Sequence, residues 1–143
     1  MKLTPYILLA LAMVGIGDTM FLSYYAYLHI VPTCALKGCE IVLASVYSHP
    51  FGVPFAYIGL LYYLHVLGLA LLASIFPNSK AVAFAALVYS GVGLLLSIGF
   101  ELFQVFVIGA LCMYCAISAT TTLLLFATSL WHWRTTRVST PVA

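Results

Sequence analysis

Four long apolar stretches dominate the sequence, and short polar breaks separate them. The stretches lie near residues 5–30, 53–76, 81–108 and 112–133. Each has at least the roughly 20 residues that a helix needs to cross a bilayer. The pattern therefore predicts an all-α integral membrane protein, built as a bundle of four transmembrane helices.

The breaks between the stretches contain residues typical of turns. The break between the first two spans is the longest and runs from Pro32 to about Gly52, whereas the third break covers only about residues 108–111. Within the long break, residues 41–47 are apolar enough to form a short amphipathic helix at the membrane interface. We expect an extracytoplasmic loop with a short helix between spans one and two.

Composition supports the membrane prediction and argues against nucleic-acid binding. The chain is 65% hydrophobic and 6% charged, whereas soluble domains have about 25% charged residues. A net charge of +2 is too small for a nucleic-acid-binding surface.

The first apolar run continues past Asp18 to about Ile30, which is too long for a signal peptide, so we expect a retained span. We predict one domain over residues 1–133 and a short cytoplasmic tail over residues 134–143.

The distribution of positive charge predicts the orientation. Four of the five basic residues fall on one side of a four-span chain: Lys2, Lys80, Arg134 and Arg137. Lys37 alone falls on the other side. Because short cytoplasmic loops carry the excess of Lys and Arg, both termini are expected in the cytoplasm of a multi-pass protein of the inner or plasma membrane. Trp131 and Trp133 suit the aromatic belt at that inner boundary.

Four cysteines form two close pairs. Cys34 and Cys39 lie in the loop after span one, and Cys112 and Cys115 lie where span four begins. Loops after spans one and three of a serial bundle share a side, so all four thiols should face the non-cytoplasmic compartment. That compartment is usually the oxidising one, where disulfide chemistry persists.

The spacing within each pair favours redox chemistry. On the first turn of a helix, Cys112 and Cys115 would share a face, and the positive end of the helix dipole would favour a reactive thiolate. Gly38 lets the loop fold tightly enough to join Cys34 and Cys39. Taken alone, the loop pair is either a structural staple or a shuttle, and the nearby C-x-x-C favours a shuttle that works by thiol exchange.

The same cysteines are compatible with roles that involve no redox chemistry. The C-x-x-C thiols could be buried apolar side chains without reactivity. Two short-spaced pairs are also typical of a four-cysteine zinc site. A non-enzymatic membrane scaffold with structural disulfides is a further alternative.

The order of these motifs resembles the vitamin K epoxide reductase family in its microbial form. The resemblance rests on the loop pair, the serine at position 45, the Gly52-Val-Pro54 turn, and the run from Gln104 into the C-x-x-C. It extends over about residues 15–130. The resemblance implies a thiol–disulfide oxidoreductase that reoxidises a thioredoxin-fold partner and passes two electrons to a quinone of the ubiquinone or menaquinone type. Disulfide formation in other proteins would follow.

The resemblance also implies a role for each cysteine. Cys34 and Cys39 would be the shuttle pair that meets the partner, Cys39 would attack Cys112, and Cys115 would face the quinone ring. Many microbial relatives carry a fused thioredoxin-like domain, and this chain is too short to hold one. We therefore expect a soluble, DsbA-like partner in trans.

Four residues are candidates for binding the quinone, and they match the family pattern less well than the cysteines do: Ser45, Phe55, Tyr62 and Ala119. Ser45 corresponds to the serine that the family has near its site, and Tyr62 belongs to a set of aromatic residues that suits a flat quinone. Animal members have an asparagine near the position of Phe55 and a tyrosine at that of Ala119. These two departures put quinone-epoxide reduction in doubt.

Ionisable residues near the predicted site are secondary candidates. Asp18 and Glu101 lie within predicted spans, where a carboxyl group is costly to bury. Either one could relay protons to a reduced quinone, or each could simply be protonated or bonded to a neighbouring helix. His29 and His49 bracket the reactive loop, where they could assist proton transfer or cap the structure.

Overall fold

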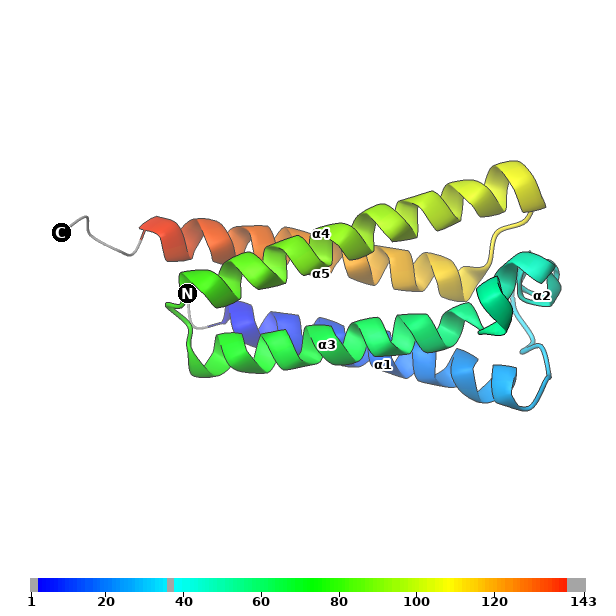
Figure 1. Cartoon of the computed structure of the whole chain (residues 1–143), viewed down its shortest axis with the longest axis horizontal. Helices are drawn as coiled ribbons and strands as arrows, with labels where there is room; N and C mark the ends of the chain where they lie inside the picture. The colour runs from blue at the N-terminus through cyan, green and yellow to red at the C-terminus, as the bar shows by residue number, and fades with distance from the viewer. Residues whose placement is uncertain (1–2, 36–37, 139–143) are drawn as a thin grey trace.

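Four long helices form an elongated bundle in the computed structural model, which describes residues 3–35 and 38–138 (Figure 1). They are α1 (Thr4–Tyr27), α3 (Phe55–Ile75), α4 (Lys80–Phe103) and α5 (Met113–Val138). Each is long and apolar enough to cross a membrane, and α4 continues through a π-helical turn, η3 (Gln104–Ile108). Within the described ranges there is no strand. The predicted all-α, four-span architecture is confirmed.

Local sequence signals explain where several helices begin and end. Pro5 lies in the first turn of α1, where a missing N–H group costs nothing. The Ser79 hydroxyl caps α4 by accepting a hydrogen bond of 3.4 Å from the Val82 N–H. Gly109 has a φ of 74° and ends the π-helical turn, because this left-handed conformation suits glycine.

The fourth span extends beyond its predicted end. We expected the span to stop at residue 133 and a tail to begin at Arg134, but α5 continues to Val138. Thr135 and Thr136 donate their hydroxyl protons to backbone carbonyl oxygens one turn earlier, so these polar side chains are satisfied within the helix. Residues 134–138 are therefore helical, and residues 139–143 lie outside the described part of the chain.

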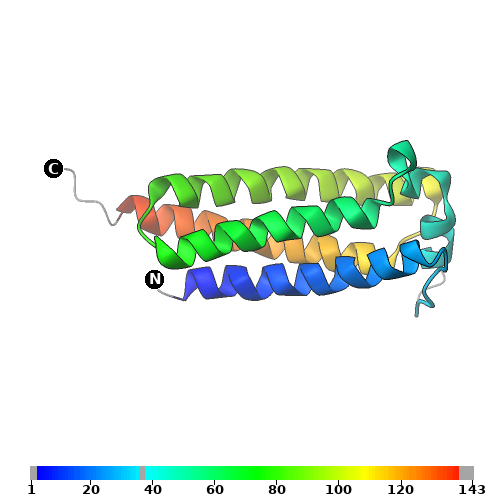
Figure 2. The same ribbon diagram turned by 60° about the horizontal axis from the view of Figure 1, so that its bottom comes forward.

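The bundle is closely packed in the half that contains the N-terminus. Each helix contacts two neighbours in the cyclic order α1, α3, α4, α5 (Figure 2). A buried cluster fills the centre of this half: Leu8, Ala12, Tyr63, Val66, Ala70 and Leu125. Gly15 lies directly against the Tyr63 ring, where any side chain would overlap it. Small residues thus allow close helix approach in a setting where lipid is as apolar as the core.

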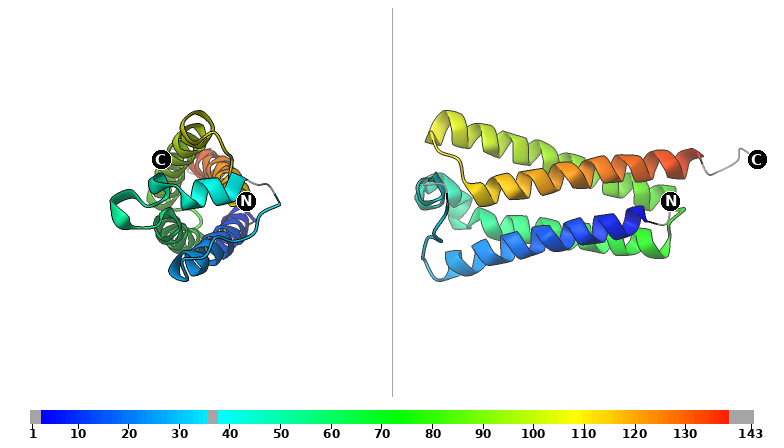
Figure 3. Two further views of the ribbon diagram at one scale, coloured as in Figure 1. Left: turned by 90° about the vertical axis from the view of Figure 1, so that its right-hand side faces the viewer. Right: turned by 180° about the vertical axis from the view of Figure 1, so that it is seen from behind.

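A short cap covers the other end of the bundle. It consists of α2 (Gly38–Ala44) and two 3₁₀ turns, η1 (Val46–Ser48) and η2 (Pro50–Gly52). Viewed from this end, α2 lies across the ends of the long helices (Figure 3). The helix predicted at residues 41–47 is present but begins three residues earlier and ends at Ala44. The cap is the element that positions the first cysteine pair.

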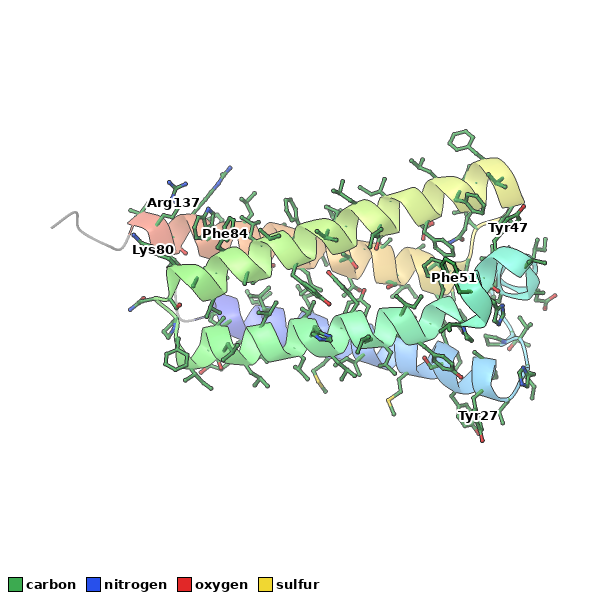
Figure 4. All side chains as sticks on the ribbon, viewed as in Figure 1. Tyr27, Tyr47, Phe51, Lys80, Phe84 and Arg137 are labelled. Carbon is green, nitrogen blue, oxygen red and sulfur yellow. A yellow bond between two sulfur atoms is a disulfide. The ribbon has the colours of Figure 1, made fainter. Side chains whose placement is uncertain are left out.

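The two ends of the bundle differ in charge. Lys80 and Arg137 lie at the end away from the cap, whereas Tyr27 and Tyr47 lie at the cap end (Figure 4). The Arg137 guanidinium is 5.4 Å from the centre of the Trp133 ring, a cation–π contact. Lys2 and Lys37, which we also used to predict orientation, lie outside the described residues.

Candidate redox site

The loop cysteines are joined. Cys34 and Cys39 form a disulfide with an S–S bond of 2.06 Å and a Cα–Cα distance of 6.0 Å. Cys39 lies in the first turn of α2 and is completely buried, whereas Cys34 precedes the helix and is partly exposed. Gly38 packs so closely on the C-x-x-C entrance that a Cβ atom there would overlap the Leu111 carbonyl oxygen. Glycine is therefore needed here for close approach as well as for loop folding.

The second pair starts the fourth span, as predicted. Cys112 and Cys115 are free thiols, the first completely buried and the second partly so. The Ala116 N–H donates to the Cys112 carbonyl oxygen at 3.0 Å, so Cys112 provides the first carbonyl of the helical ladder. The Cys112 sulfur is consequently close to the N–H groups of Tyr114 and Cys115 in the first turn of α5.

The two pairs meet at one end of the bundle. Cys39, Val42 and Cys112 form a single buried cluster, and Cys34 and Cys115 pack against it. The Met113 N–H donates to the Cys39 sulfur at 3.3 Å, which ties the loop pair to the first turn of α5. The expectation that topology alone brings the pairs together is confirmed.

The surroundings of Cys112 favour its thiolate. The pKa of Cys112 is lowered to about 7, primarily because its sulfur accepts a hydrogen bond from the Cys115 thiol. The backbone N–H groups of Cys115 and Tyr114 add to this effect, while burial and the nearby Glu101 carboxylate oppose it. Cys112 is therefore suited to be a reactive thiol and a good leaving group.

Gln104 holds the start of α5 in place, and the sequence analysis assigned it no role. It lies in η3 and is completely buried. Its Oε1 accepts a hydrogen bond of 3.0 Å from the Cys112 N–H. Its Nε2 has no well-aligned acceptor, and the acceptor that it faces is the Cys115 sulfur. One amide side chain thus interacts with both cysteines. The sequence signal that could have identified Gln104 was a polar residue at the end of an apolar span.

A cavity of about 460 Å³ opens beneath the cap, between the long helices. Such a volume suits a small organic ligand. Of the predicted quinone-binding residues, Phe55, Tyr62 and Ala119 line it, and so does Cys115. Ser45 is not among the described residues that line the cavity, and its hydroxyl donates to the Val42 carbonyl oxygen at 2.7 Å. The serine of the cap that lines the cavity is Ser48.

The cavity is mainly apolar with a few polar groups. Phe55 stacks on Phe100 with a centroid distance of 4.4 Å, so flat rings form part of the wall. The ionisable residues that we considered from the sequence also line it: Asp18, His29, His49 and Glu101. Ser48 Oγ is 2.7 Å from His49 Nδ1, which places a hydrogen-bonded pair at the mouth under the cap.

The geometry bears on the alternatives for the cysteines. In the described ranges, no group of three or more His, Cys, Asp or Glu side chains is placed to hold a metal ion. Two of the four sulfurs are joined to each other, and a disulfide sulfur is not a thiolate ligand. A structural disulfide alone would not require a second pair of free thiols packed against it. The arrangement favours thiol exchange.

Comparison with known sequences gives one family. The sequence pattern shared by the vitamin K epoxide reductase family matches residues 6–130, nearly the whole chain. No curated protein matches it.

Proposed function

The chain belongs to the vitamin K epoxide reductase family, and from that premise we propose that it reoxidises a soluble thioredoxin-fold protein and passes two electrons to a quinone. The family consists of membrane oxidoreductases that act on thiols and disulfides. The observation that carries the proposal is the contact between Cys39 and the start of α5, because it links a partly exposed disulfide to a sulfur that lines a cavity.

Burial determines where a partner protein can react. Cys39 and Cys112 are completely buried, while Cys34 is partly exposed. A partner thiolate therefore attacks the Cys34 sulfur, forming a mixed disulfide and releasing Cys39 as a thiolate. The second thiol of the partner then attacks its own mixed disulfide, so that the partner leaves oxidised and Cys34 is left reduced.

The electrons next move to the second pair. The Cys39 thiolate attacks Cys112 within a Cys112–Cys115 disulfide and releases Cys115. Cys34 then attacks Cys39, which restores the loop disulfide and releases Cys112. A lowered pKa makes Cys112 a good leaving group for this step. The products, a loop disulfide with free Cys112 and Cys115, have the bonding present in this structure.

The cavity fits a quinone head group. Its wall is mainly apolar, it contains aromatic rings, and Cys115 is the site cysteine that lines it among the described residues. Phe55, Tyr62 and Ala119 would hold the ring, and a bound quinone would supply an acceptor for two electrons and two protons. Formation of the Cys112–Cys115 disulfide releases the same numbers, so the reaction balances.

The charge distribution supports an outward-facing site. Lys80, Arg134 and Arg137 belong to the end of the bundle opposite the cap, and short cytoplasmic loops are rich in such residues. The proposal therefore places both termini in the cytoplasm and the cysteines at the outer face of the inner or plasma membrane. A partner in trans would meet Cys34 there.

The proposal is tested by trapping the partner and by following the quinone. Purified full-length protein is mixed with a reduced DsbA-like protein and ubiquinone-1, and quinone reduction is followed by absorbance. A reduced DsbA-like protein whose second active-site cysteine is replaced by alanine should attack the Cys34–Cys39 disulfide and accumulate as a mixed disulfide at Cys34, because no second thiol is present to release it. Cys115→Ala should abolish quinone reduction. Ser74→Ala, near the far end of α3, is the control and should behave as wild type. Quinone reduction by Cys115→Ala at the wild-type rate, or the absence of any mixed disulfide, would overturn the proposal.

A further inference from the structure

The deeper wall of the cavity contains two polar atoms without partners. Asp18 Oδ2 on α1 and Tyr62 Oη on α3 are both buried, and neither has a hydrogen-bond partner among the described residues. Both residues line the cavity. The adjacent Tyr63 behaves differently, since its hydroxyl is 2.8 Å from the Ser118 carbonyl oxygen and 3.0 Å from Thr122 Oγ1.

Unpartnered buried polar atoms need an explanation. Burying a hydroxyl or carboxyl group without a hydrogen bond costs free energy, and most such groups in proteins are satisfied. Tyr62 is held in place by packing, because the hydroxyl end of its side chain lies against Gly93 and its ring stacks on Tyr89 at 5.3 Å. Because both residues line one cavity, a polar ligand in that cavity is the available partner for each group.

The position of these groups relative to Cys115 suits the two ends of a quinone ring. Asp18 interacts electrostatically with Tyr63, and the Tyr63 hydroxyl bonds to Ser118, one turn after Cys115 on α5. At about 1.5 Å of rise per residue, Ser118 lies about 4.5 Å deeper than Cys115 along the helix. A ring carbonyl placed near Cys115 leaves the opposite carbonyl at this depth.

We propose that Asp18 and Tyr62 form the inner end of the quinone site, where each donates a hydrogen bond to the bound quinone and Asp18 protonates the inner ring carbonyl during reduction. This inference rests on the proposed function, because it requires that a quinone occupies the cavity. Phe55 and Ala119 carry no hydrogen-bonding side-chain groups, so the residues at those positions cannot take this role.

The protons and electrons balance in this scheme. Cys112 and Cys115 lose two electrons and two protons as their S–S bond forms. The outer ring oxygen gains one proton from the thiols, and the inner oxygen gains one from the Asp18 carboxyl. The second thiol proton is released to the aqueous phase, from which Asp18 regains a proton. A general acid of this kind typically contributes about 10²–10⁴-fold to a rate.

Binding and chemistry are separated by two substitutions at one position. Asp18→Asn keeps a hydrogen-bond donor but cannot give up a proton, whereas Asp18→Leu removes both. Equilibrium binding of ubiquinone-1 is measured on the fully oxidised protein, which has no electrons to transfer. The rate of Cys112–Cys115 oxidation is measured separately, by reducing the protein, adding ubiquinone-1 and quenching with a thiol label. Glu40→Gln, which removes an exposed carboxyl outside the cavity, is the matched control.

The expected results differ for each variant. Asp18→Asn should bind ubiquinone-1 within about threefold of wild type but oxidise its thiols about 100-fold more slowly. Asp18→Leu and Tyr62→Phe should each bind about tenfold more weakly, because a hydrogen bond is lost. Wild-type oxidation by Asp18→Asn, or wild-type binding by Asp18→Leu, would overturn the inference.

Two further readouts make the outcome decisive. Exchange between the loop disulfide and the C-x-x-C, followed with dithiothreitol, should be unchanged in every variant if the fold is intact. If Asp18→Asn alters that exchange, its fold is in question and the test uses Tyr62→Phe instead. Ubiquinone-1 binding by Tyr62→Phe as tight as that of wild type then contradicts the inference. If the wild type itself is not oxidised by ubiquinone-1, the proposed function has failed, whereas an oxidised wild type with an equally fast Asp18→Asn rejects only this inference.

Discussion

Replacing Gln104 by leucine should slow disulfide exchange while leaving the bundle folded. Leucine has a similar size but cannot accept the 3.0 Å hydrogen bond from the Cys112 N–H. Gln104 and Cys112 are both completely buried. Leaving such a buried donor unpaired costs about 1–3 kcal/mol. At about 1.4 kcal/mol per tenfold change, the first turn of α5 would be correctly formed about 5- to 150-fold less often relative to disordered alternatives. The exchange rate should therefore fall by up to about that factor.

The assay follows the loop disulfide and the C-x-x-C by thiol labelling and mass spectrometry after mixing with dithiothreitol. Gln104→Glu is the matched variant, because its carboxylate still accepts from the Cys112 N–H but lacks the amide group that faces Cys115. Both variants should unfold at a lower temperature than wild type in detergent, Gln104→Leu because the Cys112 N–H loses its acceptor and Gln104→Glu because a carboxyl group is buried. Gln104→Glu should still exchange faster than Gln104→Leu. If Gln104→Leu exchanged and unfolded like wild type, the argument that this amide holds Cys112 in place would be refuted.

Three other predictions concern the cap, the thiol and the cavity. Gly38→Ala should slow exchange at least about tenfold because its Cβ overlaps a backbone oxygen and forces α2 away, while Gly17→Ala, which meets nothing within 4 Å, should not. The ultraviolet absorbance of the Cys112 thiolate in the reduced protein should rise with pH through about 7, because the thiolate forms above that pKa. A rise only near 9 would contradict the assignment. Ala119→Trp should fill the cavity and block oxidation by ubiquinone-1 without affecting exchange, whereas Ala127→Trp on the exposed face should have no effect on either reaction.

The sequence was sufficient for the architecture and for the meeting of the cysteine pairs. Apolar stretches of about 20 residues have few options in a bilayer, and loops on one side of a serial bundle must lie near one another. The relation of Cys39 to Cys112 follows from these two constraints. The predicted end of α5 was wrong because threonines bond to carbonyl oxygens of the preceding turn, so polar residues do not always end a helix.

Features that depend on exact helix ends could not be predicted. Ser45 and Ser48 are three residues apart, and which one lines the cavity depends on α2 ending at Ala44 and on the following 3₁₀ turn. Helix boundaries are uncertain by a few residues in any sequence-based prediction. Gln104 was missed for a related reason, since its contact with Cys112 requires the π-helical turn and the left-handed Gly109 that redirects the chain.

The complete burial of Cys39 and Cys112 has a consequence for the chemistry of the surrounding compartment. Small thiols are abundant in cells, and a sulfur accessible to them would let any reductant feed electrons into the quinone pool. Such leakage would consume oxidising capacity without making a disulfide in any folding protein. In the proposed mechanism a reductant reacts first at Cys34, the partly exposed sulfur of the loop disulfide, so specificity at this first step would be set at one atom while Cys39 and Cys112 stay hidden behind it.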